Sequence, residues 1–212
     1  MLLNHNKALH LIKLLDKSIK NPKTSLKYRN RFTLLTSVVL SAQCTDTNVN
    51  NVTKKIYQKY YQPEHFIDLG INKIKKLIKS IGLFNTKAKN IYHLSKILLD
   101  KHRGKVPDKF EALILLPGVG RKTANVVLNA VFNKPTIAVD THVFRVGNRT
   151  GLANGKNPTQ VEDQLLKILP KNHIKKAHHL ILLHGRYTCK ARNPLCKKCV
   201  INKVCLYKGK NE

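Results

Sequence analysis

Residues 116–124, which read LPGVGRKTA, constrain the fold and the function of this chain more than any other stretch. Gly118 and Gly120 can adopt positive φ angles and have no Cβ atom, so a turn that they form with Val119 and Arg121 can bring backbone N–H groups close to a ligand. The following residues begin a helix, and a helix N-terminus attracts phosphate. Such a contact holds DNA without reading its base sequence. The stretch therefore predicts a DNA-binding turn built from Gly118, Val119, Gly120 and Arg121.

Lys122 lies in the first turn of the helix that this stretch begins. The positive end of the helix and the neighbouring cations disfavour the ammonium form there. A neutral lysine amine is a nucleophile. A lysine in a basic protein is ordinarily no more than a solvated charge. Its setting beside the turn is what makes Lys122 a candidate catalytic residue.

Asp140, in the stretch VDTH at residues 139–142, supplies a carboxylate a short distance downstream. An aspartate in this position is also a good N-cap for the helix that follows. The two roles are compatible, because the positive end of a helix keeps a capping carboxylate ionised and oriented. We therefore expect Asp140 to cap a helix and to take part in the chemistry.

Four of the five cysteines follow the spacing C-x6-C-x2-C-x5-C, at Cys189, Cys196, Cys199 and Cys205. In a reducing compartment such a cluster is more typical of metal binding than of disulfides. The spacing alone allows either tetrahedral zinc or an iron–sulfur cluster. The fifth cysteine, Cys44, stands apart, and we expect it to be a small, buried apolar residue.

The chain carries 40 Lys and Arg residues against 11 Asp and Glu residues, a formal net charge of +29. This excess favours a polyanionic partner, above all nucleic acid. A general enrichment in lysine is an alternative explanation for much of this positive charge, because only eight of the basic residues are Arg. The segment from Cys189 to Cys205, which we call the cysteine segment, contains Lys190, Arg192 and further lysines but no acidic residue. We therefore expect it to bind phosphates.

Apolar residues recur at helical spacing along the chain, and no segment alternates with the period of a β-strand. We therefore predict an all-α fold. No apolar run approaches the ~20 residues of a membrane span, and the first residues lack the apolar core of a signal peptide. We expect a cytoplasmic protein, associated with the nucleoid, that makes no membrane contact.

Residues at the predicted helix ends place the boundaries. We expect Asp46, Asn72, Asp108 and Asp140 to act as N-caps, Gly82 to end a helix in a left-handed conformation, and Thr86 to open the next one. The predicted helices cover residues 8–19, 31–42, 46–60, a short stretch from 63 to 70, 72–82, 86–103, a stretch from 108 to the turn, 120–132, 141–150, and two more from about 158 and 173.

Several motifs together resemble a known family. They are residues 40–43 (LSAQ), 82–85 (GLFN), 116–124 (LPGVGRKTA), 139–143 (VDTHV), 184–186 (HGR) and the four C-terminal cysteines. The stretch LPGVGRKTA looks like the helix-hairpin-helix of the endonuclease III family, the bifunctional DNA glycosylase/AP lyases of the helix-hairpin-helix superfamily. The resemblance covers nearly the whole chain. It implies a six-helix domain at residues 24–134 and a discontinuous second domain, residues 1–23 with 135–212, that carries a [4Fe-4S] cluster.

The resemblance also implies roles for single residues. Lys122 would form a Schiff base with the sugar of an oxidised pyrimidine nucleotide or an abasic site in double-stranded DNA, and Asp140 would assist. Gln43 and Leu83 would fill the hole left by the flipped nucleotide. Lys190 and Arg192 would dock DNA. We expect the enzyme to act as a monomer, with the cluster holding the loop rather than transferring electrons.

Two alternatives remain open. A monofunctional, adenine-type glycosylase of the same fold would share the hairpin and the cluster but not the lysine at 122. A non-catalytic DNA-binding module would need neither Lys122 nor Asp140. The chain departs from the family at Ile114, where some relatives carry an acid, and at Cys44, where alanine is usual.

Overall fold

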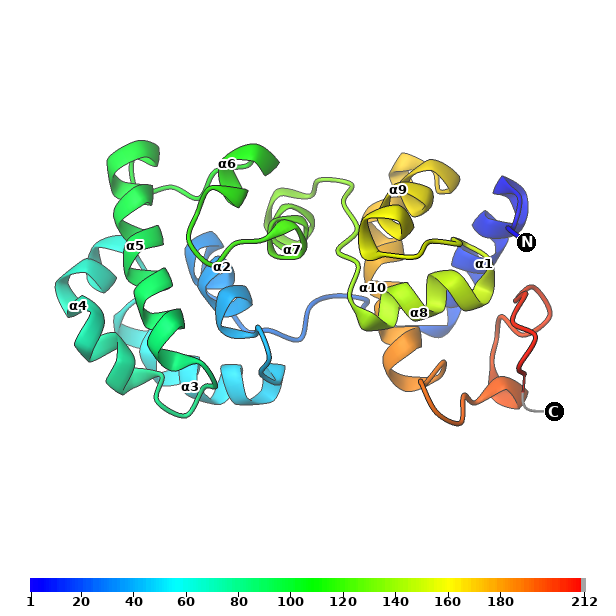
Figure 1. Ribbon diagram of the computed structural model, residues 1–212, viewed down its shortest axis with the longest axis horizontal. Helices are drawn as coiled ribbons and strands as arrows, with labels where there is room; N and C mark the ends of the chain where they lie inside the picture. The colour runs from blue at the N-terminus through cyan, green and yellow to red at the C-terminus, as the bar shows by residue number, and fades with distance from the viewer. Residues whose placement is uncertain (211–212) are drawn as a thin grey trace. The chain divides into compact units, whose positions relative to one another are not determined.

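The computed structural model describes residues 1–210, which form ten α-helices and one short 3₁₀ helix (Figure 1). No strand occurs within this range, so the predicted all-α fold is confirmed. The chain divides into two compact units, which we call the six-helix unit (Thr24–Phe132) and the terminal unit (Met1–Lys23 with the residues from Asn133 onward). Their identity as the two domains expected from the family resemblance stays a prediction.

The six-helix unit is organised around α2 (Arg31–Leu40), in which every residue from Phe32 to Leu40 is buried. This explains why the helix is apolar around its circumference rather than along one stripe. Helix α2 packs against α3, α5 and α7, while α4 packs against α5 and α6 against α7. The other helices of the unit are α3 (Asp46–Lys59), α4 (Pro63–Leu77), α5 (Phe84–His102), α6 (Phe110–Ile114) and α7 (Arg121–Phe132).

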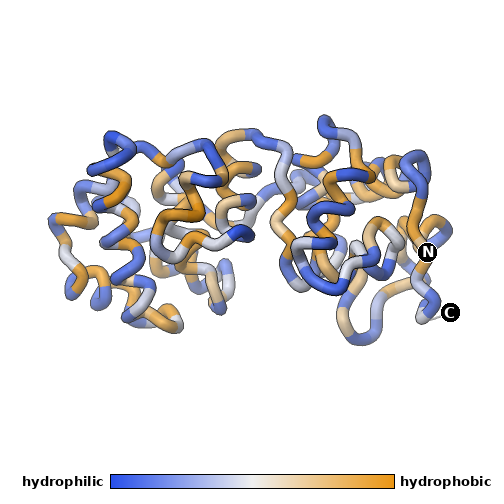
Figure 2. The backbone as a smooth tube through the Cα atoms, turned by 45° about the horizontal axis from the view of Figure 1, so that its top comes forward, coloured by the Kyte–Doolittle hydropathy of each residue, from blue (hydrophilic) through white to orange (hydrophobic). Residues whose placement is uncertain are grey.

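The terminal unit packs its own core from both ends of the chain. Helix α10 (Lys171–Tyr187) contacts both α1 (His5–Ser18) and α8 (Thr141–Thr150). The remaining elements are α9 (Pro158–Ile168) and the 3₁₀ helix η1 (Cys196–Lys198). Along the helices, short apolar and polar stretches follow one another, as expected of amphipathic segments (Figure 2).

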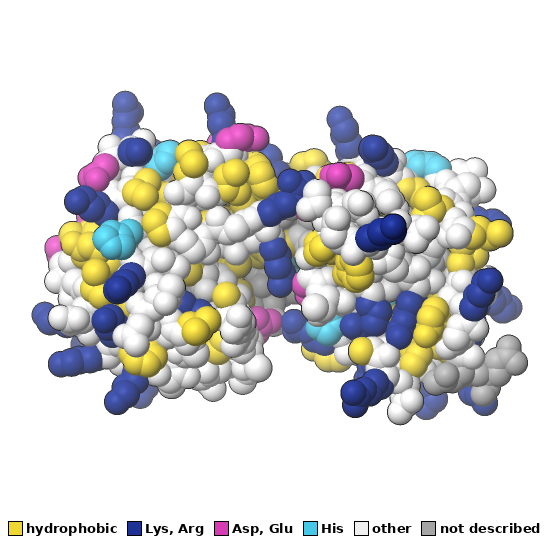
Figure 3. Space-filling view, in the orientation of Figure 1, with side chains coloured by type: hydrophobic (Ala, Val, Ile, Leu, Met, Phe, Trp, Pro, Cys, Tyr) yellow, Lys and Arg dark blue, Asp and Glu magenta, His cyan; other side chains and the backbone are white. Residues whose placement is uncertain are grey.

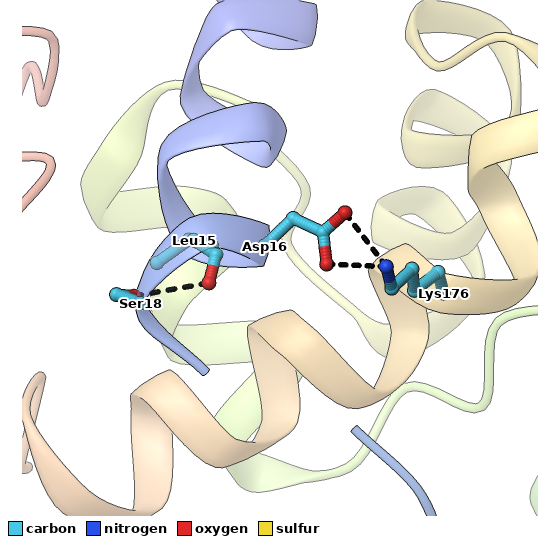
Figure 4. A network of polar contacts seen from close by, with 4 residues as sticks. All are labelled: Leu15, Asp16, Ser18 and Lys176. Carbon is cyan, nitrogen blue, oxygen red and sulfur yellow. Dashed lines mark hydrogen bonds and ion pairs between the residues drawn. The ribbon is translucent and has the colours of Figure 1, made fainter. Parts of the chain in front are cut away.

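A surface ion pair also joins α1 to α10. The Lys176 Nζ atom lies 2.5 Å from Asp16 Oδ1 and 2.7 Å from Oδ2 (Figure 4). Both side chains are well exposed, so the pair contributes little stability. The apolar contacts of Leu11 and Leu15, both fully buried, hold α1 in the unit instead.

Three of the predicted N-caps were wrong. Thr45 caps α3, because its side chain accepts from the Asn48 N–H group, and Asp46 lies one residue inside the helix, where its carboxylate accepts from the Ser25 hydroxyl. The N-cap of α6 is Lys109 rather than Asp108. Asn72 lies within α4, two residues after a non-helical break at Gly70 (φ of 65°), so the predicted break is present although Asn72 is not the residue at which it falls.

The segment between α4 and α5 also differs from its prediction. Helix α4 ends at Leu77, and the left-handed residue is Leu83, with φ of 58°, rather than Gly82. Helix α5 then begins at Phe84, two residues before Thr86. The predicted cap at Asp140 is confirmed, and the helix predicted from about residue 158 begins at Pro158, with Asn157 as its N-cap. Within the described residues no helix is both long and apolar enough to cross a membrane.

Candidate functional site

The turn before α7 requires glycine at one of its two glycine positions. Gly118 has φ of +79°, and a Cβ atom built on it would lie 2.8 Å from Asn90 Nδ2 and 3.1 Å from Asn90 Cβ. Both its left-handed backbone and the close approach of Asn90 therefore exclude a side chain. The φ angle of Gly120 is not positive, and a Cβ there would meet nothing within 4 Å. Of the two glycines, both of which can adopt a positive φ angle, only Gly118 does so.

The turn leads directly into the N-terminus of α7. The Val119 N–H group donates to the Leu116 carbonyl at 3.0 Å, and the Val119 side chain is buried, which anchors the turn to the core. The Ala124 N–H group donates back to the Gly120 carbonyl at 2.9 Å. The amides that precede Ala124 in the first turn cannot be satisfied within the helix, and such groups attract anions. The exposed Arg121 guanidinium lies 5.5 Å from the centre of the Phe110 ring.

Lys122 is an exposed residue of the first turn of α7, two residues after Gly120. Its position places a long amine-bearing side chain at the helix end that the turn presents. The structure therefore puts the candidate nucleophile and the candidate phosphate-binding amides on the same helix terminus. Ile114, the departure from the family pattern, is exposed at the end of α6 and carries no charge that could pair with a lysine.

Asp140 caps α8 in the terminal unit. Its Oδ1 atom accepts from the His142 N–H group at 2.9 Å and from the Val143 N–H group at 2.8 Å. Both bonds use one oxygen, and within residues 1–210 the other, Oδ2, accepts no hydrogen bond. The half-buried carboxylate is thus oriented by the helix while one oxygen stays available to a substrate.

The two candidate residues for filling a gap in DNA lie in the six-helix unit. Gln43 follows the end of α2 and Leu83 immediately precedes α5, and both side chains are exposed. The Leu83 side chain is 58% exposed, so this apolar residue is not part of the hydrophobic core. Both residues have left-handed backbones, with φ of 53° and 58°.

The four C-terminal cysteines line one cavity in the terminal unit. Burial raises the pKa values of the Cys199 and Cys205 thiols, and the neighbouring cysteines raise them further. Within residues 1–210 no three His, Cys, Asp or Glu side chains form a site for a single metal ion. Four cysteine thiols that share one cavity are a donor set that iron–sulfur clusters use. The residues present therefore fit an iron–sulfur cluster.

Two arginines of α8 hold the start of the cysteine segment, a role that the sequence motifs did not predict. Arg145 donates from Nε to the Cys189 carbonyl at 3.0 Å and from Nη2 to the Gly185 carbonyl at 2.8 Å. Arg149 donates from Nη1 to the Lys190 carbonyl at 2.7 Å and lies 3.7 Å from Cys189 Sγ. A signal was available, because these are two of only eight arginines in a lysine-rich chain and they are spaced i, i+4 on one helix face.

Two histidines lie beside these groups. His142 Nδ1 lies 3.1 Å from Arg145 Nη2, and His184 Nε2 lies 3.7 Å from Cys199 Sγ. Burial lowers the pKa of His184 to about 4, so this side chain is neutral near pH 7. Lys190 and Arg192 are both exposed on the cysteine segment. Lys and Arg side chains are also spread over the surface in view, with few acidic ones (Figure 3).

Comparisons with known proteins agree with this geometry. Residues 36–171 match the family described as HhH-GPD superfamily base excision DNA repair protein. The chain is 55% identical to an endonuclease III of Rickettsia conorii, with 93% of this chain and 94% of the relative covered. It is 50% identical to an endonuclease III of Escherichia coli strain K12, with 98% and 99% covered. A solved structure described as a trapped endonuclease III–DNA covalent intermediate, the estranged-adenine complex, superimposes with a TM-score of 0.90 at 42% identity, covering 96% of each chain.

Gly118 and Gly120 should respond differently to substitution by alanine. Gly118→Ala should destabilise the protein by about 1–2 kcal/mol from the left-handed backbone alone, with a further cost from the crowding against Asn90. Gly120→Ala should change the stability by less than about 0.5 kcal/mol, because its Cβ enters open space. Urea unfolding of both variants measures the difference. Equal destabilisation by the two substitutions would contradict the described conformation of the turn.

Proposed function

The chain belongs to the HhH-GPD superfamily of base excision DNA repair proteins and, within it, to the endonuclease III family, and we propose that Lys122 and Asp140 carry its chemistry. The protein is a DNA glycosylase and AP lyase that acts on oxidised pyrimidines in DNA. The observation that carries the residue assignment is the exposed position of Lys122 in the first turn of α7, directly after a turn suited to phosphate.

The first step exchanges one bond at the sugar. The neutral Lys122 amine attacks C1′ of the damaged nucleotide, and the bond from C1′ to the base breaks with its electron pair leaving on the base. Lys122 then gives up one amine proton, the C1′–O4′ bond opens with O4′ taking a proton, and a protonated Schiff base, the iminium, forms between Lys122 and the sugar. Phosphates bound at the N-terminus of α7 would hold the strand while this occurs.

The second step cuts the strand. The iminium at C1′ makes the C2′ proton acidic, and its removal expels the 3′-phosphate by β-elimination. Water then hydrolyses the remaining imine and releases Lys122. The phosphodiester is not hydrolysed, so the reaction needs no divalent cation at the phosphate.

Asp140 acts in the first step through its charge. A carboxylate held by the α8 cap stabilises the positive charge that develops on the sugar as the base departs, and it assists removal of a proton from the attacking amine. The capping bonds to Oδ1 support this role, because they orient the group before the substrate arrives. Gln43 and Leu83 would occupy the space of the flipped nucleotide, Gln43 by hydrogen bonds and Leu83 as an apolar wedge.

Cys189, Cys196, Cys199 and Cys205 would hold a [4Fe-4S] cluster in the cavity that they line. The cluster would supply a rigid centre for the segment that carries Lys190 and Arg192, and those two side chains would bind DNA phosphates. A DNA substrate would also place the enzyme at the nucleoid in the cytoplasm.

Separate substitutions test the two catalytic roles. Lys122→Gln should abolish strand cleavage while damaged DNA still binds, because the backbone of the turn is unchanged. Asp140→Asn should slow the reaction by about 10²–10⁴-fold, since it keeps a capping oxygen and loses the charge. Single-turnover cleavage of a thymine-glycol duplex measures both rates. Lys122→Gln cleaving at the parent rate would show that another amine is the nucleophile.

The cluster assignment predicts about four irons per chain in protein purified anaerobically, together with a yellow-brown colour. Cys199→Ser should lose the iron, whereas Cys44→Ser, which changes the one cysteine outside the cavity, should retain it. Iron and zinc are measured together by elemental analysis. One zinc per chain in place of iron would contradict the assignment.

The docking role of the cysteine segment predicts a change in salt dependence. Lys190→Ala or Arg192→Ala should each reduce the log–log slope of duplex binding against salt by about one unit, with the lesion preference unchanged. Lys13→Ala, which removes an exposed cation from α1, controls for the change in net charge. An altered lesion preference at an unchanged salt slope would reject the docking role.

A further inference from the structure

Gln43 and Leu83 lie 40 residues apart in the sequence but share an unusual backbone conformation. Both are non-glycine residues with left-handed φ angles, of 53° and 58°. That conformation costs about 1–2 kcal/mol for such residues, so surrounding contacts must hold it. The two segments also come close together, because a Cβ atom built on Gly82 would lie 3.9 Å from the Gln43 carbonyl oxygen.

A buried lysine ties the two segments to each other. Lys87 lies on α5, four residues after Leu83, and is only 4% exposed. Its Nζ atom donates to the Leu40 carbonyl at 2.8 Å and to the Ala42 carbonyl at 2.6 Å, at the end of α2 and directly before Gln43. A cation is favoured there, because the last carbonyls of a helix carry partial negative charge. Burial lowers the pKa of Lys87, and Cys44 opposes that effect.

A second side chain makes a similar connection from α3. Asn48 donates from Nδ2 to the Ser80 carbonyl at 3.2 Å and to Cys44 Sγ at 3.3 Å. Ser80 precedes Leu83 by three residues, and Cys44 follows Gln43. Lys87 and Asn48 thus connect the same two segments from two different helices, and neither has a role in the chemistry at Lys122.

We propose that Lys87 and Asn48 are positioning residues that hold Gln43 and Leu83 as one lesion-probing element, so that both side chains enter the base stack at a fixed separation. The proposal rests on the proposed role of Gln43 and Leu83 in filling the space of the flipped nucleotide. A gap in stacked DNA has defined dimensions, and displacement of a positioning group by about 1 Å can cost on the order of 100-fold in rate. Lys87 acts through the Leu40 and Ala42 carbonyls rather than by touching DNA.

Lys87→Met is the principal test, because it keeps the aliphatic stem and removes both hydrogen bonds. We expect single-turnover excision of thymine glycol from duplex DNA to fall by about tenfold or more. Binding of undamaged duplex and its salt slope should match those of the control Lys89→Met, which removes an exposed lysine from the same helix. Excision by Lys87→Met at the rate of Lys89→Met would overturn the proposal.

A double-mutant cycle separates positioning from general loosening of the fold. In a Gln43→Ala/Leu83→Ala background, adding Lys87→Met should slow excision by less than about twofold, because nothing remains to be positioned. A further tenfold loss in that background would overturn the proposal. If Gln43→Ala/Leu83→Ala itself excises at the parent rate, the proposed function of these two residues fails first, and the positioning role fails with it.

Asn48→Ala provides a second test of the proposal in case the Lys87→Met protein does not fold. Asn48 is only half-buried, so its removal should leave the fold intact. We expect Asn48→Ala, like Lys87→Met, to slow excision, in this case by about threefold or more. In the Gln43→Ala/Leu83→Ala background it should have no effect. Parent-rate excision by a folded Asn48→Ala protein would contradict the proposal.

Discussion

The start of a helix cannot satisfy its own first backbone N–H groups, and this constraint organises both candidate catalytic residues. At α7 a turn that requires glycine at position 118 precedes these N–H groups. The exposed Lys122 extends from the same helix end. At α8 they are occupied by the chain itself, since Asp140 Oδ1 accepts from two of them. One helix start is thus suited to a phosphate and an attacking amine, and the other fixes a carboxylate.

The same helix that Asp140 caps also organises the cysteine segment. Arg145 and Arg149 project from α8 and bind backbone carbonyls at Gly185, Cys189 and Lys190. Guanidinium groups suit this task because they present several donors in a fixed plane. The carboxylate, the predicted cluster and the proposed docking cations therefore share one structural support within the terminal unit.

Features decided by local chemistry could be predicted from the sequence. The Asp140 cap and the helix start at Pro158 each depend on residues within one turn of each other. Features that depend on partners distant in the sequence could not be predicted. Asp46 looked like a cap, but Ser25 binds its carboxylate and Thr45 takes the capping position. Lys87 resembles the other lysines of a basic chain, and only the fold brings it to carbonyls that are 45 and 47 residues away.

The Lys122 amine at the start of α7 is the group that we propose forms the covalent bond to DNA. Borohydride reduction of the parent enzyme bound to abasic duplex, followed by nuclease and protease digestion and mass spectrometry of the peptides, identifies the modified residue directly. We expect a sugar adduct on Lys122, in a peptide that trypsin no longer cleaves after that residue. An adduct on a different lysine or on the N-terminal amine, with Lys122 unmodified, would contradict it.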